Sequence, residues 1–428
     1  MSNEAVYANC NLVHKSRLET ISFWSAAAVI FLIAIFSRRP DVLTYPQFFA
    51  EDGSVWYQQA YNQGALQALL IPQVGYLQTL PRLVALGSLG LPFATAPLLF
   101  NLCGMLAQVA PALFLLSDRM RHLARFSYRT VFAVLLIAQP NVAELHVSIT
   151  YAQWHLALLA FLVLVALPPE RTSEKLFDCG VLTLCCASGP FCILLLPSAF
   201  LLWTLNKARW QSVRLGILAV GACVQGTSLL LSHHHARSHA PLGAAWQLLF
   251  RILAGQVVLP IFQGSNRLQH WAHSKNQVLI VAITLTASAA IVSLWAFWRG
   301  SAPLRAFLLF AGMVLASALL SPMGNLTSNQ WEAISVPGAA GRYWYLPSLA
   351  IACVLFWMLS TGRPLIVRGL ALLLLCSMSL ASMRSWRYPA MTNLDFPHYA
   401  STFAALPPGA QFQIPINPSG WEMKLTKH

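Results

Sequence analysis

The stretch ITYAQWHLALLAFLVLVAL at residues 149–167 decides the fold class. It contains no Asp, Glu, Lys or Arg, and its length is close to the roughly 20 residues that a helix needs to cross a bilayer core. A short polar loop, Pro168–Lys175, follows it and carries Arg171 and Lys175. Similar apolar runs with short basic loops between them recur along the chain. The pattern predicts an integral membrane protein built of helices, which satisfy their own backbone groups in lipid.

Composition excludes two other classes. The chain has 428 residues, of which 57% are hydrophobic and 9% charged, whereas a soluble domain carries about a quarter charged residues. The net charge of +14 comes from basic residues between the apolar runs, without the clustered basic and aromatic residues of a nucleic-acid groove. The sequence therefore predicts neither a soluble fold nor a nucleic-acid partner.

The basic loops set the predicted topology, because short loops rich in Lys and Arg stay in the cytoplasm. With Lys15 and Arg17 inside, the loops 118–129, 168–175, 206–214, 299–305 and 363–368 also fall inside. Met1–Thr20 is polar and lacks a cleavage site, so the first run is expected to be a retained anchor. About eleven spans of uneven length result, outward at 21–36, 130–143, 176–188, 213–231, 304–320 and 365–382, and inward at 93–116, 149–167, 190–204, 277–298 and 343–360.

The segments on the other side of the membrane are expected to carry the function. They are 37–92, 139–149, 232–276, 321–342 and a tail, 383–428. Residues 1–382 are predicted to form one membrane domain. The tail is too short for an independent domain. Its Gly409–Trp421 stretch alternates like an edge strand, which Pro415 and Pro418 are expected to break. We expect it to pack on the outer face, as a possible lid.

The acidic pair Glu51-Asp52 is the first candidate site. It precedes residues 54–70, whose pattern predicts an uncharged interfacial helix. A helix start favours a carboxylate and is expected to hold it ionised. The alternative is an ordinary helix cap. Because the chain has only 13 acidic residues, an adjacent acidic pair beside the membrane favours a catalytic role.

A second group surrounds the turn before the 149–167 run. Glu144 and His146 lie in this turn and are expected to face the same cavity as Asp52, although Glu144 has the alternative of a solvated loop carboxylate. Gln153, Trp154 and His155 open the span. For Trp154, anchoring at the membrane interface is the alternative.

Cations are predicted on the same side. They are Arg82, Arg251, Arg267, Lys275 and Arg342. Arg342, within Gly341–Tyr345, lies at the mouth of a span, where a guanidinium can hold a lipid phosphate through two hydrogen bonds or reach the headgroups. His233–His235 with His239 have the composition of a metal site, but consecutive residues cannot all face one ion, so an exposed loop is favoured and no metal site is predicted.

These features together resemble the GT-C superfamily of membrane glycosyltransferases. The resemblance covers most of the chain, and several short motifs are similar to a bacterial group of such proteins. The motifs are Phe49–Gly53, Gly75–Leu77 with Pro81-Arg82, Ala152–His155, Ser188–Phe191, Gly341–Tyr343 and Ile414–Trp421.

The resemblance implies inverting transfer of a sugar from a polyprenyl-phosphate donor. The acceptor would be a cell-envelope glycan, a lipid-linked oligosaccharide or a surface protein such as pilin, at the periplasmic face of the bacterial inner membrane. By position, Asp52 would be the general base with Glu51 and Glu144 beside it. Arg342, Tyr345, Arg82 and Arg251 would bind the donor phosphate, and Gln153, Trp154, His155, His146 and Tyr76 the acceptor or sugar. No cofactor is assigned, and dependence on a divalent metal stays open because some members of the superfamily use one.

Two other functions fit a polytopic chain. One is a lipid or glycolipid flippase or transporter, and the other is a non-catalytic subunit for assembly or polymer export. Ion-coupled transporters carry ionisable residues near the bilayer midplane, and the centres of the predicted spans contain almost none. This disfavours ion coupling but leaves a passive flippase open.

Overall fold

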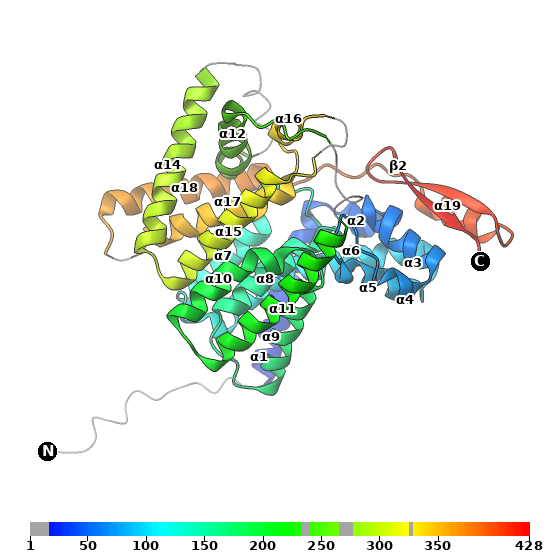
Figure 1. Ribbon diagram of the computed structural model, residues 1–428, viewed down its shortest axis with the longest axis horizontal. Coiled ribbons are helices and arrows are strands. Elements are labelled where there is room, and N and C mark those ends of the chain that lie inside the picture. The colour runs from blue at the N-terminus through cyan, green and yellow to red at the C-terminus, as the bar shows by residue number, and fades with distance from the viewer. Residues whose placement is uncertain (1–16, 233–239, 265–276, 325–327, 361) are drawn as a thin grey trace.

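The computed structural model describes residues 17–232, 240–264, 277–324, 328–360 and 362–428 (Figure 1). The predicted histidine loop, His233–His235 with His239, lies outside the described residues, as do Arg267, Lys275 and Lys15. The described chain is mostly helical, and a helix stands at each of the eleven predicted spans. These helices are α1 (Arg17–Arg38), α6 (Ala96–Leu116), α7 (Phe126–Ala138), α8 (Ala152–Val165), α9 (Thr172–Cys186), α10 (Phe191–Leu205), α11 (Arg209–Leu231), α14 (Gln277–Arg299), α15 (Ala302–Leu320), α17 (Gly341–Met358) and α18 (Leu365–Arg384).

Helix length separates these elements into two groups. Within the described residues, seven helical segments are long and apolar enough to cross a membrane, and six of them correspond to α1, α6, α11, α14, α15 and α18. Helices α7, α8 and α10 are apolar but shorter. The chain is therefore a multi-pass helical membrane protein, and seven segments of its described part meet the length of a full crossing. The number of about eleven spans stays a prediction.

The seventh segment, Trp246–Gln263, lies within the stretch 232–276 that the prediction assigned to an outer loop. It consists of α12 (Trp246–Ile252), the π-helical turn η4 (Leu253–Val258) and α13 (Leu259–Gln263). Its mean hydropathy of 1.2 is below the 1.5 to 2.1 of the other six segments. Polar residues such as Gln247 and Arg251 interrupt the apolar pattern in the sequence. The segment nevertheless packs through an apolar face, because Ile252 and Val257 are buried in one cluster with Trp344 of α17.

Short helices fill the first loop and the remaining connections. They are α2 (Asp41–Thr44), η1 (Asp52–Tyr57), α3 (Gln58–Gln63), α4 (Ala65–Ala68), α5 (Thr79–Ser88), η2 (Phe93–Thr95), η3 (Asp118–Met120), α16 (Gln330–Ser335) and α19 (Phe396–Ala404). The single helix predicted for residues 54–70 is wrong, because Gly64 separates α3 from α4. Its φ of +94° lies in a region that favours glycine and does not continue a helix.

The tail adds a β-hairpin to the helical fold. Strand β1 (Gln411–Ile416) pairs antiparallel with β2 (Trp421–Thr426). Pro415 does not break β1, contrary to the prediction, and it stands opposite Glu422. A two-stranded sheet has only edge strands, in which a proline can leave its missing N–H unpaired.

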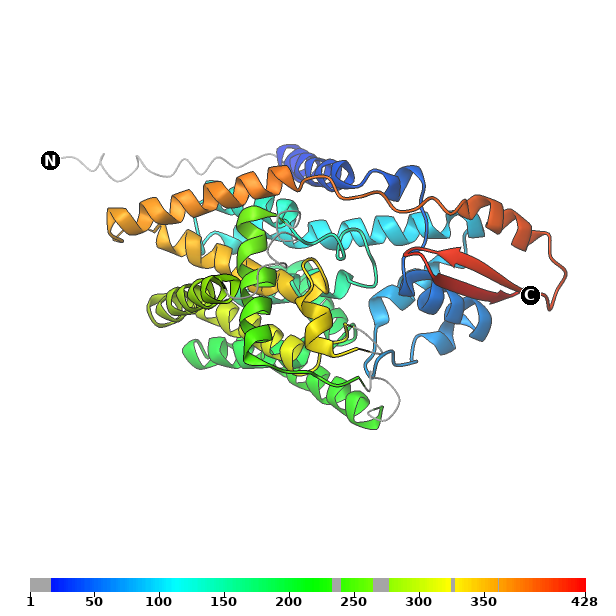
Figure 2. The ribbon, with the colours of Figure 1, turned by 90° about the horizontal axis from the view of Figure 1, so that it is seen from above.

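The tail packs directly on the first loop, as the two views in Figures 1 and 2 show. Phe396, Ile414, Ile416, Met423 and Leu425 of the tail are buried in one cluster with Phe48, Trp56 and Tyr57 of the loop. Asn62 Nδ2 donates to the Lys424 carbonyl over 2.8 Å, and Lys424 N donates to Gln58 Oε1 over 2.7 Å. The first loop and the tail therefore fold as one unit beside the helical bundle.

Arginines bind carbonyl groups at one end of the bundle. Arg129 donates to the carbonyls of Leu115 (2.9 Å) and Ser117 (2.6 Å), at the end of α6. Arg214 donates to those of Leu164 (3.2 Å) and Ala166 (3.1 Å), at the end of α8. These are carbonyls that a helix C-terminus leaves without partners, so the arginines act as caps.

Candidate functional site

Asp52 is the most deeply buried carboxylate of the predicted site. It begins η1 and is 1% exposed. The Thr150 hydroxyl donates to its Oδ1 over 2.6 Å, and the Thr150 N–H donates to the same atom over 3.1 Å. The Trp56 indole N–H donates to the Thr150 hydroxyl oxygen over 2.8 Å. A short chain of hydrogen bonds thus fixes the carboxylate against the segment before α8.

The backbone around the pair is held by the tail. Phe48 and Ala50 exchange backbone hydrogen bonds with Asn417. A Cβ atom at Gly53 would lie 3.0 Å from Ile416 Cδ1 and 3.0 Å from Phe48 Cβ, closer than side chains normally pack. Glycine at this position therefore lets β1 approach the residue that follows Asp52.

The protonation of the pair differs from the prediction. Burial raises the pKa of Asp52 to about 7, and the Thr150 hydrogen bonds oppose that shift only in part. Burial also raises the pKa of Glu51, against the charge of Arg342. For Asp52 the expectation that the helix start holds the carboxylate firmly ionised is wrong, because loss of hydration outweighs the helix terminus. Glu51, the residue before η1, also makes no side-chain capping hydrogen bond.

Glu144 and Arg342 form an ion pair between distant parts of the chain. The Arg342 backbone N–H also donates to Glu144 Oε2 over 3.0 Å, and its guanidinium donates to the Met323 carbonyl. The two side chains are 21% and 18% exposed, respectively. The turn before α8 and the start of α17 are therefore tied together by a pair that solvent reaches.

Tyr151 joins this ion pair to the acidic pair. The Arg342 guanidinium lies 5.6 Å from the Tyr151 ring centroid, and Tyr151 directly follows the Thr150 that binds Asp52. The charges of Arg342 and Glu144 both act on Glu51. The structure thus brings together Glu51, Asp52, Glu144 and Arg342, which we call the acidic cluster. Sequence reasoning missed Thr150 and Tyr151, whose one signal was their position just before Gln153–His155.

Arg82 contacts the acidic cluster only indirectly, through Trp56. It is buried, lies 4.9 Å from the Trp56 ring centroid and donates to Gln59 Oε1 over 2.9 Å. Because Trp56 binds Thr150, Arg82 reaches Asp52 only through two intermediate side chains. It is placed to hold Trp56 in position, and its assignment to the donor phosphate stays a prediction.

The candidates at the start of α8 are buried among protein groups. Trp154 packs edge to face on Phe191, with ring centroids 4.7 Å apart. His155 Nδ1 lies 3.2 Å from the Tyr345 hydroxyl. Among the described residues, Gln153 Oε1, Trp154 Nε1 and His155 Nε2 are buried without a hydrogen-bond partner. Buried polar atoms are normally paired, so each of these three atoms is left open to a hydrogen bond from or to a ligand group.

Three predicted site residues lie elsewhere. His146 packs edge to face on Tyr388 (5.0 Å between centroids), in a second cluster where the Arg38 guanidinium covers the same Tyr388 ring at 4.3 Å. Arg251 is exposed on α12. Tyr76 is half-buried in the tight turn 73–76.

The donor set at the acidic cluster is carboxylates, hydroxyls and one guanidinium. Within the described residues, no group of three or more His, Cys, Asp or Glu side chains is arranged to hold a metal ion. The arrangement can therefore accept a proton at Asp52 and pair an anion with Arg342. No protein-family model and no curated protein matches the chain. The GT-C resemblance stays a prediction that rests on the short motifs.

Proposed function

We propose that the protein is an inverting glycosyltransferase of the GT-C type, which moves a sugar from a polyprenyl-phosphate donor to a cell-envelope glycan or surface-protein acceptor. The observation that carries the proposal is the acidic cluster. Asp52, a carboxylate with a pKa of about 7, directly follows Glu51, on which the charges of the Glu144–Arg342 ion pair act, and the guanidinium of that pair reaches solvent. A base is most effective when its pKa is close to the working pH.

In this proposal Asp52 accepts the proton of the acceptor hydroxyl. The hydroxyl oxygen forms a bond to the anomeric carbon while the bond from that carbon to the lipid phosphate breaks. One displacement inverts the anomeric configuration, and the phosphate leaves with the electron pair. Such a base contributes about 10²–10⁴ in rate. Thr150 keeps the Asp52 carboxylate in place through the two hydrogen bonds to Oδ1.

Arg342 stabilises the charge that builds on the departing phosphate. Glu144 and the Met323 carbonyl hold the guanidinium in place, and 18% of the Arg342 side chain stays accessible to the donor. We therefore assign Glu144 a positioning role. Preorganised cations of this kind are the main contribution to many transfer reactions that release a phosphate. The buried polar atoms of Gln153, Trp154 and His155 are assigned to the sugar or acceptor.

The tail is assigned the role of a lid. Asp52 is 1% exposed, so the acceptor reaches it only when a covering segment moves. Ile416 of β1 packs on Gly53, directly beside Asp52, which makes β1 the segment we assign.

The finer topology is part of the proposal. Eleven spans, with the N-terminus in the cytoplasm and the C-terminus in the periplasm of a bacterial inner membrane, agree with the basic loops. The short helices α7 to α10 then line a cavity, where incomplete spans are tolerated, and Trp246–Gln263 stays on the periplasmic side. Labelling of Ser54→Cys from the periplasm alone is expected, and labelling from the cytoplasm alone would overturn this arrangement.

The test compares Asp52→Asn with the matched exchange Asp395→Asn. Asp395 is exposed in the tail, with a left-handed backbone (φ +53°) that Asn also adopts. Purified protein in liposomes is given membrane-extracted polyprenyl-phosphate sugars, and sugar transfer to envelope acceptors is measured. Transfer by Asp52→Asn is expected to fall about 10²–10⁴-fold, with normal membrane insertion and with Asp395→Asn unchanged. Undiminished transfer by Asp52→Asn would overturn the proposal, and lipid movement without transfer by the native protein would favour a flippase.

A further inference from the structure

A cavity of about 530 Å³ lies at the end of the bundle opposite the acidic cluster. Helices α8 and α17 begin at the acidic cluster, where Glu144 meets Arg342. The cavity is lined by residues 158–165 of α8, by residues 353–357 of α17 and by residues 359–360 just after that helix. The other lining residues come from the last turn of α6, the loop residues 123–125 before α7, the first half of α7, the start of α15 with Ser301 before it, and the first turn of α18. Its volume falls in the range of small-molecule sites, about 300–1,000 Å³.

Most of the cavity wall is apolar. Large side chains such as Phe132, Phe161, Phe307, Phe356 and Trp357 line it. Along α8 it extends from Val165 to Leu158, which is about 10 Å at the helical rise of 1.5 Å per residue. The occupant must therefore carry an apolar portion that reaches toward the middle of the bundle.

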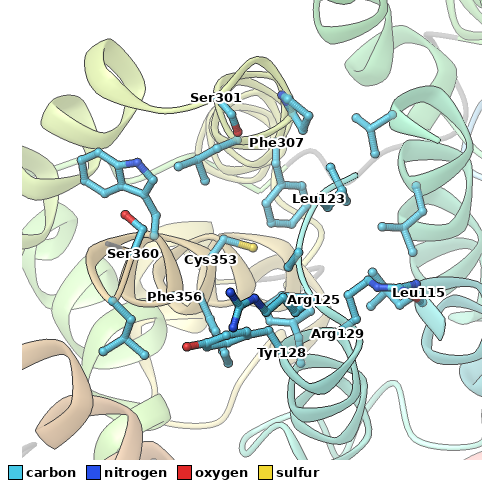
Figure 3. Close-up of a pocket in the computed structure, with 18 of the residues that line it drawn as sticks. Leu115, Leu123, Arg125, Tyr128, Arg129, Ser301, Phe307, Cys353, Phe356 and Ser360 are labelled. Carbon is cyan, nitrogen blue, oxygen red and sulfur yellow. Dashed lines mark hydrogen bonds between the residues drawn. The ribbon is translucent and has the colours of Figure 1, made fainter. Parts of the chain in front are cut away.

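The polar part of the wall is cationic. Arg125, Arg129 and Arg368 line the cavity together with Tyr128, and no lining residue is acidic. In Figure 3, Arg125 and Arg129 lie beside Tyr128 on one side of the cavity, while Phe307 and Ser301 lie on the other. Within the described residues, Arg125 and Arg368 form no ion pair. A ligand with an anionic head and an apolar tail complements this wall.

The Arg129 guanidinium is held in place on the cationic side of the cavity. Arg129 is 6% exposed, and its two hydrogen bonds to the end of α6 hold one terminal nitrogen. Its Nε is buried with no hydrogen-bond partner among the described groups. A buried guanidinium nitrogen without a partner is costly unless an acceptor binds there, and a phosphate oxygen is such an acceptor.

We propose that this cavity binds one anionic phospholipid, with its phosphate at Arg125, Arg129 and Arg368 and an acyl chain along α8. The site is distinct from the proposed donor site. The 14 residues of α8 separate the two ends by about 21 Å, so a phosphate held here does not reach Asp52. Binding at this site does not depend on the proposed transfer reaction.

The test measures lipid binding to purified, delipidated full-length protein by native mass spectrometry. Phosphatidylglycerol and phosphatidylcholine with the same acyl chains are compared on native protein and on Arg125→Ala/Arg368→Ala. We expect phosphatidylglycerol to bind the double variant at least about tenfold more weakly, since each basic residue adds to the attraction of an anionic lipid. The matched control, Arg121→Ala/Arg209→Ala, removes two exposed arginines that do not line the cavity and is expected to bind as the native protein does.

A second variant tests the apolar part without changing the charge. Cys353→Phe adds volume to the cavity wall and is expected to reduce phosphatidylglycerol binding with all three arginines in place. Unchanged binding by both Cys353→Phe and the double variant would overturn the proposal. So would equal binding of the two lipids to native protein, or a control pair that weakens binding as much as the cavity pair. Displacement of phosphatidylglycerol by polyprenyl phosphate at one tenth of its concentration would overturn the proposal and assign the cavity to a polyprenyl lipid.

Discussion

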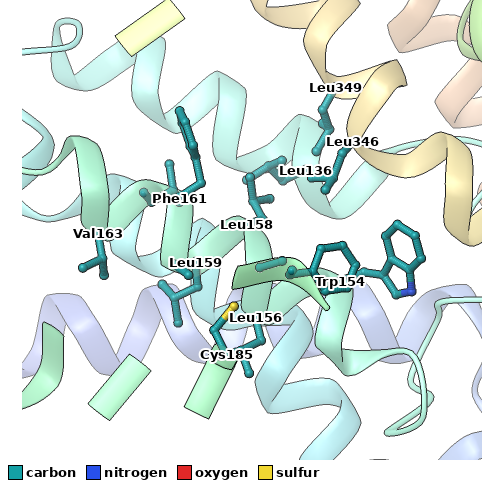
Figure 4. Packing of buried hydrophobic residues seen from close by; sticks show 14 of the residues in the cluster. Leu136, Trp154, Leu156, Leu158, Leu159, Phe161, Val163, Cys185, Leu346 and Leu349 are labelled. Atoms are coloured by element: carbon teal, nitrogen blue, oxygen red, sulfur yellow. The ribbon is translucent and has the colours of Figure 1, made fainter. Parts of the chain in front are cut away.

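Charged groups of neighbouring elements lie near both ends of α8, and the two groups are paired differently. We call the C-terminal end, where Arg214 caps the helix, the basic end, and the N-terminal end, beside the acidic cluster, the acidic end. At the basic end, Asp178 accepts from Arg119 over 2.6 and 2.8 Å and from Arg214 over 2.9 Å. At the acidic end, burial raises the pKa of Asp52 to about 7. A packed apolar core separates the two ends, with Trp154 near one and Phe161 and Val163 toward the other (Figure 4).

The difference in pairing between Asp178 and Asp52 indicates which buried charge stabilises the fold. The Asp178 carboxylate lies between two guanidinium groups and also accepts from the Trp210 indole N–H over 2.9 Å. A buried charge that is fully paired and hydrogen-bonded is compatible with a stable native state. Asp52 has hydrogen bonds from Thr150 alone among its described contacts, and Glu51 adds a like charge beside it. Perturbed carboxylates of this kind concentrate at functional sites.

The largest effect is expected on stability, from removing the Asp178 ion pairs at the basic end. Asp178→Asn leaves the buried Arg214 without its counter-charge, so the free energy of unfolding should fall by about 3–5 kcal/mol. Denaturant unfolding in detergent measures it. Asp118→Asn, at an exposed acidic residue of the same end, is the matched control and should change stability by less than about 0.5 kcal/mol. Equal changes in the free energy of unfolding for the two variants would mean that the ion pairs of Asp178 do not stabilise the fold more than an exposed carboxylate does.

The next effect concerns the ion pair at the acidic end. Arg342→Ala removes the cation assigned to the leaving phosphate, so the transfer rate should fall about 10²–10³-fold. Arg342→Lys keeps the charge but not the forked geometry, and an intermediate loss is expected. Transfer kinetics with the extracted donor check both. Arg384→Ala, at an exposed arginine at the end of α18, is the control. A loss in Arg384→Ala as large as in Arg342→Ala would argue against a specific phosphate contact.

The smallest effect sharpens the role of the Thr150 hydroxyl. Thr150→Val removes the side-chain hydrogen bond that favours ionised Asp52, a bond to a charged group worth about 1.5–3 kcal/mol. The pKa of Asp52 should then rise further by about one to two units. Transfer at pH 7 should fall about tenfold and recover at higher pH. Thr150→Ser keeps the hydroxyl and should keep the native pH profile, and a Thr150→Val profile equal to the native one would contradict this link.

The sequence predicted the helical membrane class and the positions of eleven helices, because apolar runs and basic loops depend only on local composition. It did not predict the crossing length of Trp246–Gln263, where interspersed polar residues lower the mean hydropathy to 1.2. It also missed the break at Gly64, whose φ of +94° is a backbone property that a helical-wheel pattern does not contain.

The sequence predicted which residues belong to the candidate site better than it predicted how they are arranged. Glu51, Asp52, Glu144 and Arg342 were chosen by residue type and side of the membrane, and the structure brings them together. The pKa of Asp52 was predicted with the wrong sign, because desolvation by the tail and by α8 involves contacts between residues far apart in the sequence. His146 lies two residues from Glu144, yet it packs on Tyr388 in another cluster.

The pH dependence of transfer tests the role of Asp52 most directly. Asp52 is protonated below its pKa of about 7 and ionised above it, so a base at this position predicts a transfer rate that rises about tenfold per pH unit from pH 5 and levels off above pH 7. The residual transfer of Asp52→Asn should lack this rise. A rate that is constant from pH 5 to 9, or a rise that persists unchanged in Asp52→Asn, would contradict Asp52 as the base.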